Sequence, residues 1–330
     1  MLSDQDISSK ASLNVLSSNP NQAARAARRR WRERLNDQAS KKLIAGAAAT
    51  LIGGACWGFS GTAASYLFTR CHVDVIWLMG ARQVLAGALF ILVGLIFDRK
   101  RLIGLWTDRK HWLDMLIFSL LAILMNQFAY LMTVQLTNPG TATIMQCLQL
   151  LFIMAFSCVH GKRVPRRREV LAIMLALTGT FLIATGGDPS RLSIPPLGLV
   201  MGLVTALGAA LITILPGRIL PRYGSTAVTG TAMVLSGLVV STITHPWESI
   251  PPLDTEGWIA FAVLIVVGSF LAYFLYMHGV KEIGAMRAGL LGTIEPISAT
   301  LTSALMLGTI FAPIEIVGFA LIIAMVYLAM

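Results

Sequence analysis

The chain has 330 residues, of which 56% are hydrophobic and 13% are charged, and its formal net charge is +10 at pH 7. This apolar composition excludes an ordinary soluble protein and favours one that lies within a membrane. The positive charge does not indicate nucleic acid, because the basic residues stand beside apolar segments without interleaved aromatic side chains. It favours anionic lipid at a membrane surface as a partner.

The first 42 residues form a polar tail that is rich in arginine between positions 25 and 34. We expect this tail to be disordered, or to form a basic helix that lies on the inner membrane surface and contacts anionic lipid. A simpler alternative is that its charge only keeps the N-terminus inside. A cleavable signal peptide is not expected, because the apolar stretch that follows the tail is too long for one.

A helix needs roughly 20 apolar residues to cross ~30 Å of hydrocarbon. Ten stretches after the tail approach or exceed that length: 43–68, 73–97, 113–137, 139–159, 169–187, 197–217, 225–244, 257–280, 284–308 and 312–330. The sequence therefore predicts an all-α membrane protein with ten transmembrane helices.

The basic residues alternate along these spans. Of 26 Lys and Arg residues, nine precede Leu43 and 14 lie in every second loop, whereas the intervening loops contain only Arg70 and Arg191. Because cytoplasmic loops retain positive charge, the N-terminus is expected in the cytoplasm. An even number of spans returns the C-terminus to the same side, and the expected location is the plasma (inner) membrane.

Ten helices divide into two halves of five, 43–187 and 197–330, joined by the Gly- and Pro-rich linker 188–196. An odd number of helices in each half forces the second half to enter the membrane from the opposite side, which gives inverted repeats. A shift of 146 residues (258 minus 112) aligns Trp112 with Trp258 and Tyr130 with Tyr276. Such identities are few, so the similar hydropathy of the two halves carries more weight than they do.

Several short motifs follow one another along the spans: Gly54-Ala55-Cys56-Trp57-Gly58, Arg82, Ala272-Tyr273-Phe274-Leu275-Tyr276, the segment 280–285 and Glu295-Pro296. By these motifs, residues 43–330 resemble the EamA type of the drug/metabolite transporter superfamily. The resemblance implies a transporter, with amino acids or related compounds as the substrate class. The chain departs from the family pattern at Gly161-Lys162 and Gly308-Thr309, where similar proteins commonly carry Gly-Glu, so the role of that glutamate is not carried over.

Two charged residues are predicted near mid-depth, Arg82 in the second span and Glu295 in the ninth. A charge there costs at least ~2.5–3.5 kcal/mol, so it persists where it is paired or functional. Arg82 is a candidate clamp for a carboxylate or phosphate, and Glu295 a candidate site for a proton or an amine. The structural alternative is that the two residues pair with each other, or that Glu295 caps neighbouring backbone. Pro296 predicts a local break in the helix beside Glu295.

Polar and aromatic side chains in other spans extend this candidate site. Amides inside hydrocarbon are expected to face inward, because lipid cannot satisfy their hydrogen bonds. Interhelical hydrogen bonding and ordinary packing are the structural alternatives for these groups. The candidates are Asn126, Gln127, Tyr130, Gln146, Gln149, Tyr273, Tyr276 and Trp57.

No enzyme motif, nucleotide-binding loop or metal-ligand spacing occurs in the chain, and four scattered cysteines suggest neither a metal site nor a disulfide. We therefore expect no catalytic activity and no cofactor. The leading hypothesis is a secondary transporter, an exporter that works by alternating access with a small-molecule substrate and protons as partners. A homodimer is considered as well, although nothing in the sequence decides the oligomeric state. The alternatives are a drug or nucleotide-sugar transporter of the same fold, and a non-transporting membrane scaffold that acts through its basic tail.

Overall fold

The computed structural model describes residues 20–162, 164–188, 192–283, 288 and 291–329, and every regular element in these ranges is a helix. Residues 1–19 of the predicted tail and 189–191 of the predicted linker lie outside the described residues. The prediction of an all-helical membrane protein is confirmed by this architecture.

Eight helical segments among the described residues are long and apolar enough to cross a membrane: Lys41–Thr69, Val75–Phe97, Arg109–Leu136, Pro139–His160, Arg167–Thr185, Pro196–Gly217, Leu220–Thr244 and Thr255–Val280. They coincide with the first eight predicted spans. The ninth and tenth spans fall on the shorter apolar helices Ile294–Leu307 and Pro313–Leu328. Positions 284–287 and 289–290 of the ninth span lie outside the described residues, so the count of ten spans stays a prediction.

The helices in the N-terminal part of the chain are α2 (Pro20–Thr69), α3 (Val75–Phe97), α4 (Arg99–Thr107), η1 (Arg109–His111), α5 (Trp112–Ile117), the π-helix η2 (Phe118–Leu124), α6 (Met125–Leu136), α7 (Pro139–Gln146), α8 (Gln149–His160) and α9 (Arg167–Thr185). Those that follow are α10 (Pro196–Ile214), η3 (Leu215–Gly217), α11 (Leu220–Thr244), α12 (Thr255–Ala262), the π-helix η4 (Val263–Leu271), α13 (Ala272–Ile283), α15 (Ile294–Leu307) and α16 (Pro313–Ala329).

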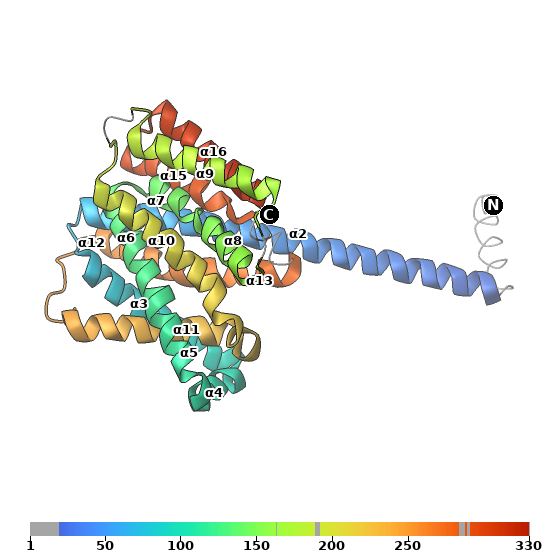
Figure 1. Ribbon diagram of the computed structural model, residues 1–330. Coiled ribbons are helices and arrows are strands. Elements are labelled where there is room, and N and C mark those ends of the chain that lie inside the picture. Colours follow the sequence, from blue (N-terminus) through green and yellow to red (C-terminus); the bar gives the residue numbers. More distant parts are fainter. Residues whose placement is uncertain (1–19, 163, 189–191, 284–287, 289–290, 330) are drawn as a thin grey trace, which may run out of the picture.

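The first membrane helix begins well before the membrane. Helix α2 runs unbroken from Pro20 to Thr69 and projects out of the bundle (Figure 1). Proline is well suited to the first helical position, and neither glycine nor proline interrupts the chain from Asn21 to Ala45. Residues 20–42 of the predicted tail therefore continue the first span, in place of a separate helix on the membrane surface.

Helices that are distant in sequence pack in pairs. α3 packs along α11, α6 along α10, and α9 along α16, while α2 contacts both α13 and α15. In Figure 1, α9 and α16 lie together at one edge of the bundle, and α3 and α11 lie toward the opposite edge, with α2 between them. The same view shows α2 leaving the bundle at the end where α16 terminates.

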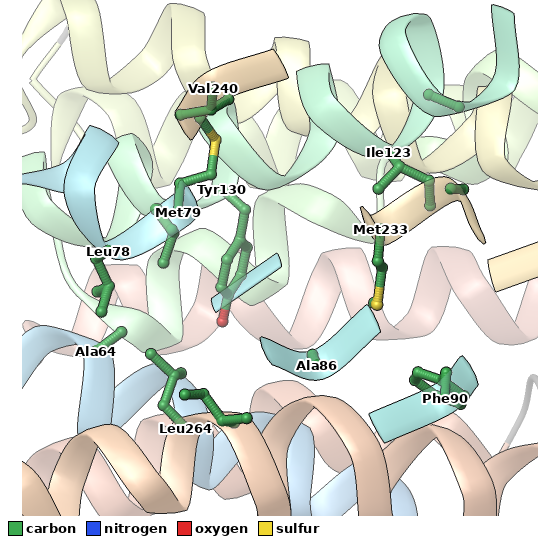
Figure 2. Packing of buried hydrophobic residues seen from close by; sticks show 14 of the residues in the cluster. Ala64, Leu78, Met79, Ala86, Phe90, Ile123, Tyr130, Met233, Val240 and Leu264 are labelled. Carbon is green, nitrogen blue, oxygen red and sulfur yellow. The ribbon is translucent and has the colours of Figure 1, made fainter. Parts of the chain in front are cut away.

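The apolar interior forms two clusters. The larger one joins α2, α3, η2, α6, α11 and η4, and the smaller one joins α7, α9, α10 and α16. Tyr130 belongs to the larger cluster. Figure 2 shows it beside Met79, with its hydroxyl directed away from Val240 and toward the side that holds Ala64 and Leu264. A polar atom thus points out of this apolar cluster toward the middle of the bundle.

Local features of the backbone recur at a spacing close to 146 residues. The π-helices η2 and η4 begin at Phe118 and Val263. Asp108 and Asp254 each accept a backbone N–H from the helix that follows them. Glu169 and Glu315 each accept the backbone N–H of the residue three positions earlier. Turns also interrupt the chain at residues 147–148 and at Thr293.

Candidate functional site

Arg82 is the one charged side chain in the buried class among the described residues, with 6% of its surface exposed. Its Nε–H donates to Ser269 Oγ at 2.8 Å, and Ser269 Oγ–H donates in turn to the carbonyl of Leu264 at 3.0 Å. The buried Nη1 has no hydrogen-bond partner within the described part of the chain. One edge of the guanidinium is therefore fixed by protein, while the other is left with donors for an acceptor that the chain does not supply.

Glu295 lies in the first turn of α15, which begins at Ile294 after the turn residue Thr293. The interruption thus comes just before Glu295, and Pro296 falls in the first turn, where its missing N–H breaks no intrahelical bond. The positive end of a helix favours a negative group at this position. Glu295 is partly buried and interacts electrostatically with Tyr130, Tyr276 and Cys147.

Tyr130 connects the two charged residues. Its side chain is 8% exposed, and it interacts electrostatically with both Arg82 and Glu295. Its hydroxyl packs against α2, where a Cβ added at Gly61 would lie 2.7 Å from it. Arg82 and Glu295 themselves form no ion pair, as the contacts of these two described residues show. The direct pairing considered from the sequence is therefore absent, and Tyr130 stands between the two groups.

Three aromatic side chains form a wall beside this centre. The ring of Trp57 lies 5.3 Å from that of Tyr273, nearly perpendicular at 80°, and 4.9 Å from that of Tyr276. Edge-to-face contacts at such distances stabilise packing as well as offering a surface to a ligand. The wall brings together α2 and α13, which lie far apart in the sequence.

The glycines of the segment 54–58 let α2 approach α15 closely. A Cβ at Gly58 would clash with the carbonyl oxygen of Glu295, and one at Gly54 would come within 2.6 Å of Ile294 Cγ2. Small residues four positions apart allow such backbone contact between membrane helices. The hydroxyl of Ser298 adds an interhelical hydrogen bond to the carbonyl of Ala55 at 2.9 Å. This contact holds Glu295 at a fixed depth next to Trp57.

The predicted amides fall into two groups. Asn126 is 4% exposed, and its Nδ2–H donates to the carbonyl of Thr205 at 2.9 Å, which ties α6 to α10. Gln127, Gln146 and Gln149 are only partly buried, and none of them hydrogen-bonds to another described residue. The structure therefore gives Asn126 a helix-packing contact, whereas three amides keep their hydrogen-bonding capacity.

Some polar contacts were not predicted from the sequence. Gln83 is 1% exposed and donates to Ser236 Oγ at 3.0 Å, which joins α3 to α11 beside Arg82. The same argument that selected Arg82, a polar side chain in an apolar span, applies to it. Near the ends of the helices, Asp108 accepts the hydroxyl of Tyr223 at 2.6 Å. No sequence pattern links those two positions.

Comparisons with known proteins agree with this architecture. The sequence model of a family described as the EamA-like transporter family matches residues 44–185 and again 196–330. An "uncharacterized inner membrane transporter YicL" of Salmonella typhimurium is 32% identical over 278 residues, which cover 84% of this chain and 92% of that one. An "uncharacterized transporter YwfM" of Bacillus subtilis is 23% identical over 82% of this chain and 88% of its own length. A solved crystal structure shares the fold with a TM-score of 0.55 at 19% identity, covering 86% of this chain and 96% of the other.

Proposed function

Because this chain belongs to the EamA-like transporter family and is a multi-pass membrane transporter, we propose that it is a secondary transporter of small organic metabolites. Amino acids or related compounds are the proposed substrates, and export is the proposed direction. Its proposed location is the plasma (inner) membrane with both termini in the cytoplasm, in line with the printed name of the Salmonella relative and with the charge alternation.

The buried, half-satisfied guanidinium of Arg82 carries this proposal. A charged donor without a partner costs free energy in a low-dielectric interior, so its retention is favoured where a ligand completes its hydrogen bonds. A carboxylate matches the planar fork of a guanidinium with two parallel hydrogen bonds. The partly exposed amides and the wall of Trp57, Tyr273 and Tyr276 would contact the rest of the substrate.

Glu295 is the proposed site for a coupling proton or a substrate amine. Its position at the start of α15, beside the turn at Thr293, matches the discontinuous helices that form substrate sites in transporters. Since it does not pair with Arg82, it is available to exchange a proton or to bind an ammonium group.

Alternating access is the proposed mechanism, with 43–187 and 197–330 as two inverted halves joined by 188–196. The double match of one family model to 44–185 and 196–330 supports a duplicated unit. The recurrence of π-helices, capping acids and turns near a 146-residue spacing supports the same alignment. So does the packing, in which α2 against α13 is matched by α10 against α6. A rocking motion of the two halves would expose the site to each side in turn.

Transport in proteoliposomes tests this function directly. The purified chain is reconstituted, and counterflow is measured for a panel of labelled amino acids with and without a pH gradient. We expect Arg82→Gln to lower the apparent affinity about 100-fold, because two charge-assisted hydrogen bonds are lost. We expect Glu295→Gln to abolish the response to the pH gradient. Counterflow of no compound in the panel would contradict the proposed substrate class.

The alternatives make different predictions in the same assay. A nucleotide sugar or drug as substrate would give counterflow only with those compounds. A scaffold that acts through its basic tail would show no transport, and it would tolerate Arg82→Met and Glu295→Met while failing when residues 1–40 are deleted. The buried guanidinium favours a transporter of small anions or zwitterions over a scaffold, because a scaffold has no use for an unpaired charge at this depth.

A further inference from the structure

A cavity of about 570 Å³ lies between α4 and the beginning of α11, away from the central site. Its lining residues are Lys100, Arg101, Gly104, Thr107, Asp108, Arg222 and Tyr223. Lys100, Gly104 and Asp108 repeat at four-residue spacing, so that one face of α4 forms one side of the cavity, and Arg222 and Tyr223 form the other. Its volume lies within the range of small-ligand sites, roughly 300–1,000 Å³.

The cations of this cavity are not fully neutralised by its acids. Asp108 is saturated, since it accepts the hydroxyl of Tyr223 at 2.6 Å and the backbone N–H of Lys110 at 3.1 Å and pairs with Arg222 Nη2 at 3.1 Å. Arg101 Nη1 contacts Asp98 Oδ2 at 3.2 Å, but both side chains are solvent-exposed, and such pairs contribute little.

Lys100 has no ion-pair partner among the described residues. The lining therefore holds three cations and one acid, and that acid is already paired with Arg222.

The backbone of α4 adds donors at the same place. Asp98 caps the helix without a side-chain hydrogen bond, so the first amides of α4 and the positive end of the helix are left for an anion. Gly104 leaves the floor of the cavity open, because a Cβ there would meet only the ring of Tyr223, at 3.8 Å. Ammonium, guanidinium and helix amides together form the set of donors that binds phosphate.

The cavity lies at the end of a membrane span. Ile96 and Phe97, the last residues of α3, are 65% and 81% exposed immediately before α4 begins. On α4 itself, Ile103 and Trp106 are exposed while Leu102 and Leu105 are buried, so this helix has an apolar side free at the height of the membrane surface. An anion in the cavity would thus sit beside exposed apolar surface, as a phospholipid headgroup does.

From these observations we infer that the cavity between α4 and α11 binds a phosphate group, through Lys100, Arg101 and Arg222. The ligand is a phosphodiester headgroup of an anionic lipid or a soluble phosphate compound, and it ties the connection after α3 to the start of α11. This site does not depend on the central site or on the transported substrate.

The test compares two double variants of equal net charge. Lys100→Gln with Arg101→Gln removes two cations from the cavity, whereas Arg99→Gln with Arg109→Gln removes two cations of the same segment that do not line it. The full chain is delipidated in neutral detergent, and its thermal unfolding is followed while dioleoylphosphatidylglycerol is added. We expect half-maximal stabilisation of the cavity variant to need about 25-fold more lipid, at about fivefold per cation. The control variant should stay within about twofold of the native chain.

Further arms identify the source of the phosphate. Inorganic phosphate and glycerophosphoglycerol are tested alone and as competitors, with dioleoylphosphatidylcholine as the uncharged lipid. Protection by the soluble compounds, lost in the cavity variant, indicates a soluble phosphate ligand. Protection by the anionic lipid alone, with the same dependence on Lys100 and Arg101, indicates a lipid headgroup. Equal weakening of both double variants, or protection of the native chain by none of these compounds, would overturn the site.

Discussion

At the scale of single residues, the orientation of Arg82 depends on a partner 187 positions away in the sequence. Ser269 accepts from Nε of Arg82 and donates to Leu264, so its hydroxyl holds one edge of the guanidinium and leaves Nη1 free. Ser269 has no charge and need not contact the substrate. It therefore acts as a positioning residue for Arg82.

Ser269→Ala should weaken substrate binding while leaving the fold intact. The lost hydrogen bond to a charged group corresponds to about 1.5–3 kcal/mol, so we expect KM for the transported compound to rise roughly 10- to 100-fold. Ser236→Ala is the matched control, because Ser236 accepts the equivalent bond from Gln83 instead of Arg82. Counterflow kinetics in proteoliposomes measure the two KM values. An equal rise for both variants would show that general loosening of α3, and not Arg82, is responsible.

Asp108 provides a prediction on pH. The hydrogen bond from Tyr223, with the backbone N–H of Lys110 and the charge of Arg222, holds the pKa of this carboxyl below its ordinary value. A lowered pKa means that these contacts stabilise the fold fully above the unfolded pKa, roughly 3.9, and are lost as pH falls through the folded pKa. The difference in Tm between the native chain and Asp108→Asn should therefore stay constant from about pH 5 to 8 and shrink only below about pH 4. Thermal unfolding in detergent measures it, and a difference that changes between pH 5 and 8 would contradict this assignment.

Sequence reasoning selected Arg82 and Glu295 because charge inside an apolar span needs an explanation. It did not predict that Tyr130 stands between them or that Asn126 binds the carbonyl of Thr205, since both depend on which helices become neighbours. The spacing of Ser269, Tyr273 and Tyr276 placed these residues on one face of a span. It could not decide which of them would contact Arg82.

At the scale of elements, helix length and apolar composition predicted the first eight spans closely, because both are local properties. The π-helices η2 and η4 were not predicted. The stretches FSLLAIL and VLIVVGSFL are apolar throughout, and such runs give no periodicity from which an extra residue per turn can be read. The length of α2 beyond the membrane was also missed, since a basic amphipathic segment is compatible with either a surface helix or a projecting one.

The contact between α2 and α15 should be sensitive to a single methyl group. We expect Gly58→Ala to destabilise the chain by about 1–3 kcal/mol, because its Cβ would meet the backbone of Glu295 and Ala299 and push the helices apart. Gly217→Ala is the control, since nothing lies within 4 Å of a Cβ at that position. Thermal unfolding in detergent compares the two variants. A loss of stability in Gly217→Ala as large as in Gly58→Ala would contradict the role of close helix approach.

At the scale of the whole molecule, the two proposed halves share their pairing pattern as well as their local irregularities. α3 with α11 and α9 with α16 each join positions that the 146-residue shift exchanges, so these pairs map onto themselves. α2 with α13 maps onto α10 with α6. A pseudo-two-fold axis between the halves accounts for all of these pairs. It also places the turns at 147–148 and at Thr293 opposite each other near the centre.

Inverted halves require that equivalent positions face opposite sides of the membrane. Asp108 and Asp254, 146 residues apart, each cap the start of a helix, so Asp108→Cys and Asp254→Cys should react with reagents on opposite sides. Both are placed in a chain whose native cysteines, Cys56, Cys71, Cys147 and Cys158, are replaced by alanine. In intact cells, an impermeant maleimide should label position 254 and leave position 108 unlabelled until the membrane is opened, because positive charge keeps the 98–112 loop inside. Labelling of both positions from the same side would rule out inverted repeats, whereas labelling of position 108 alone would preserve the inversion and reverse the orientation of the chain.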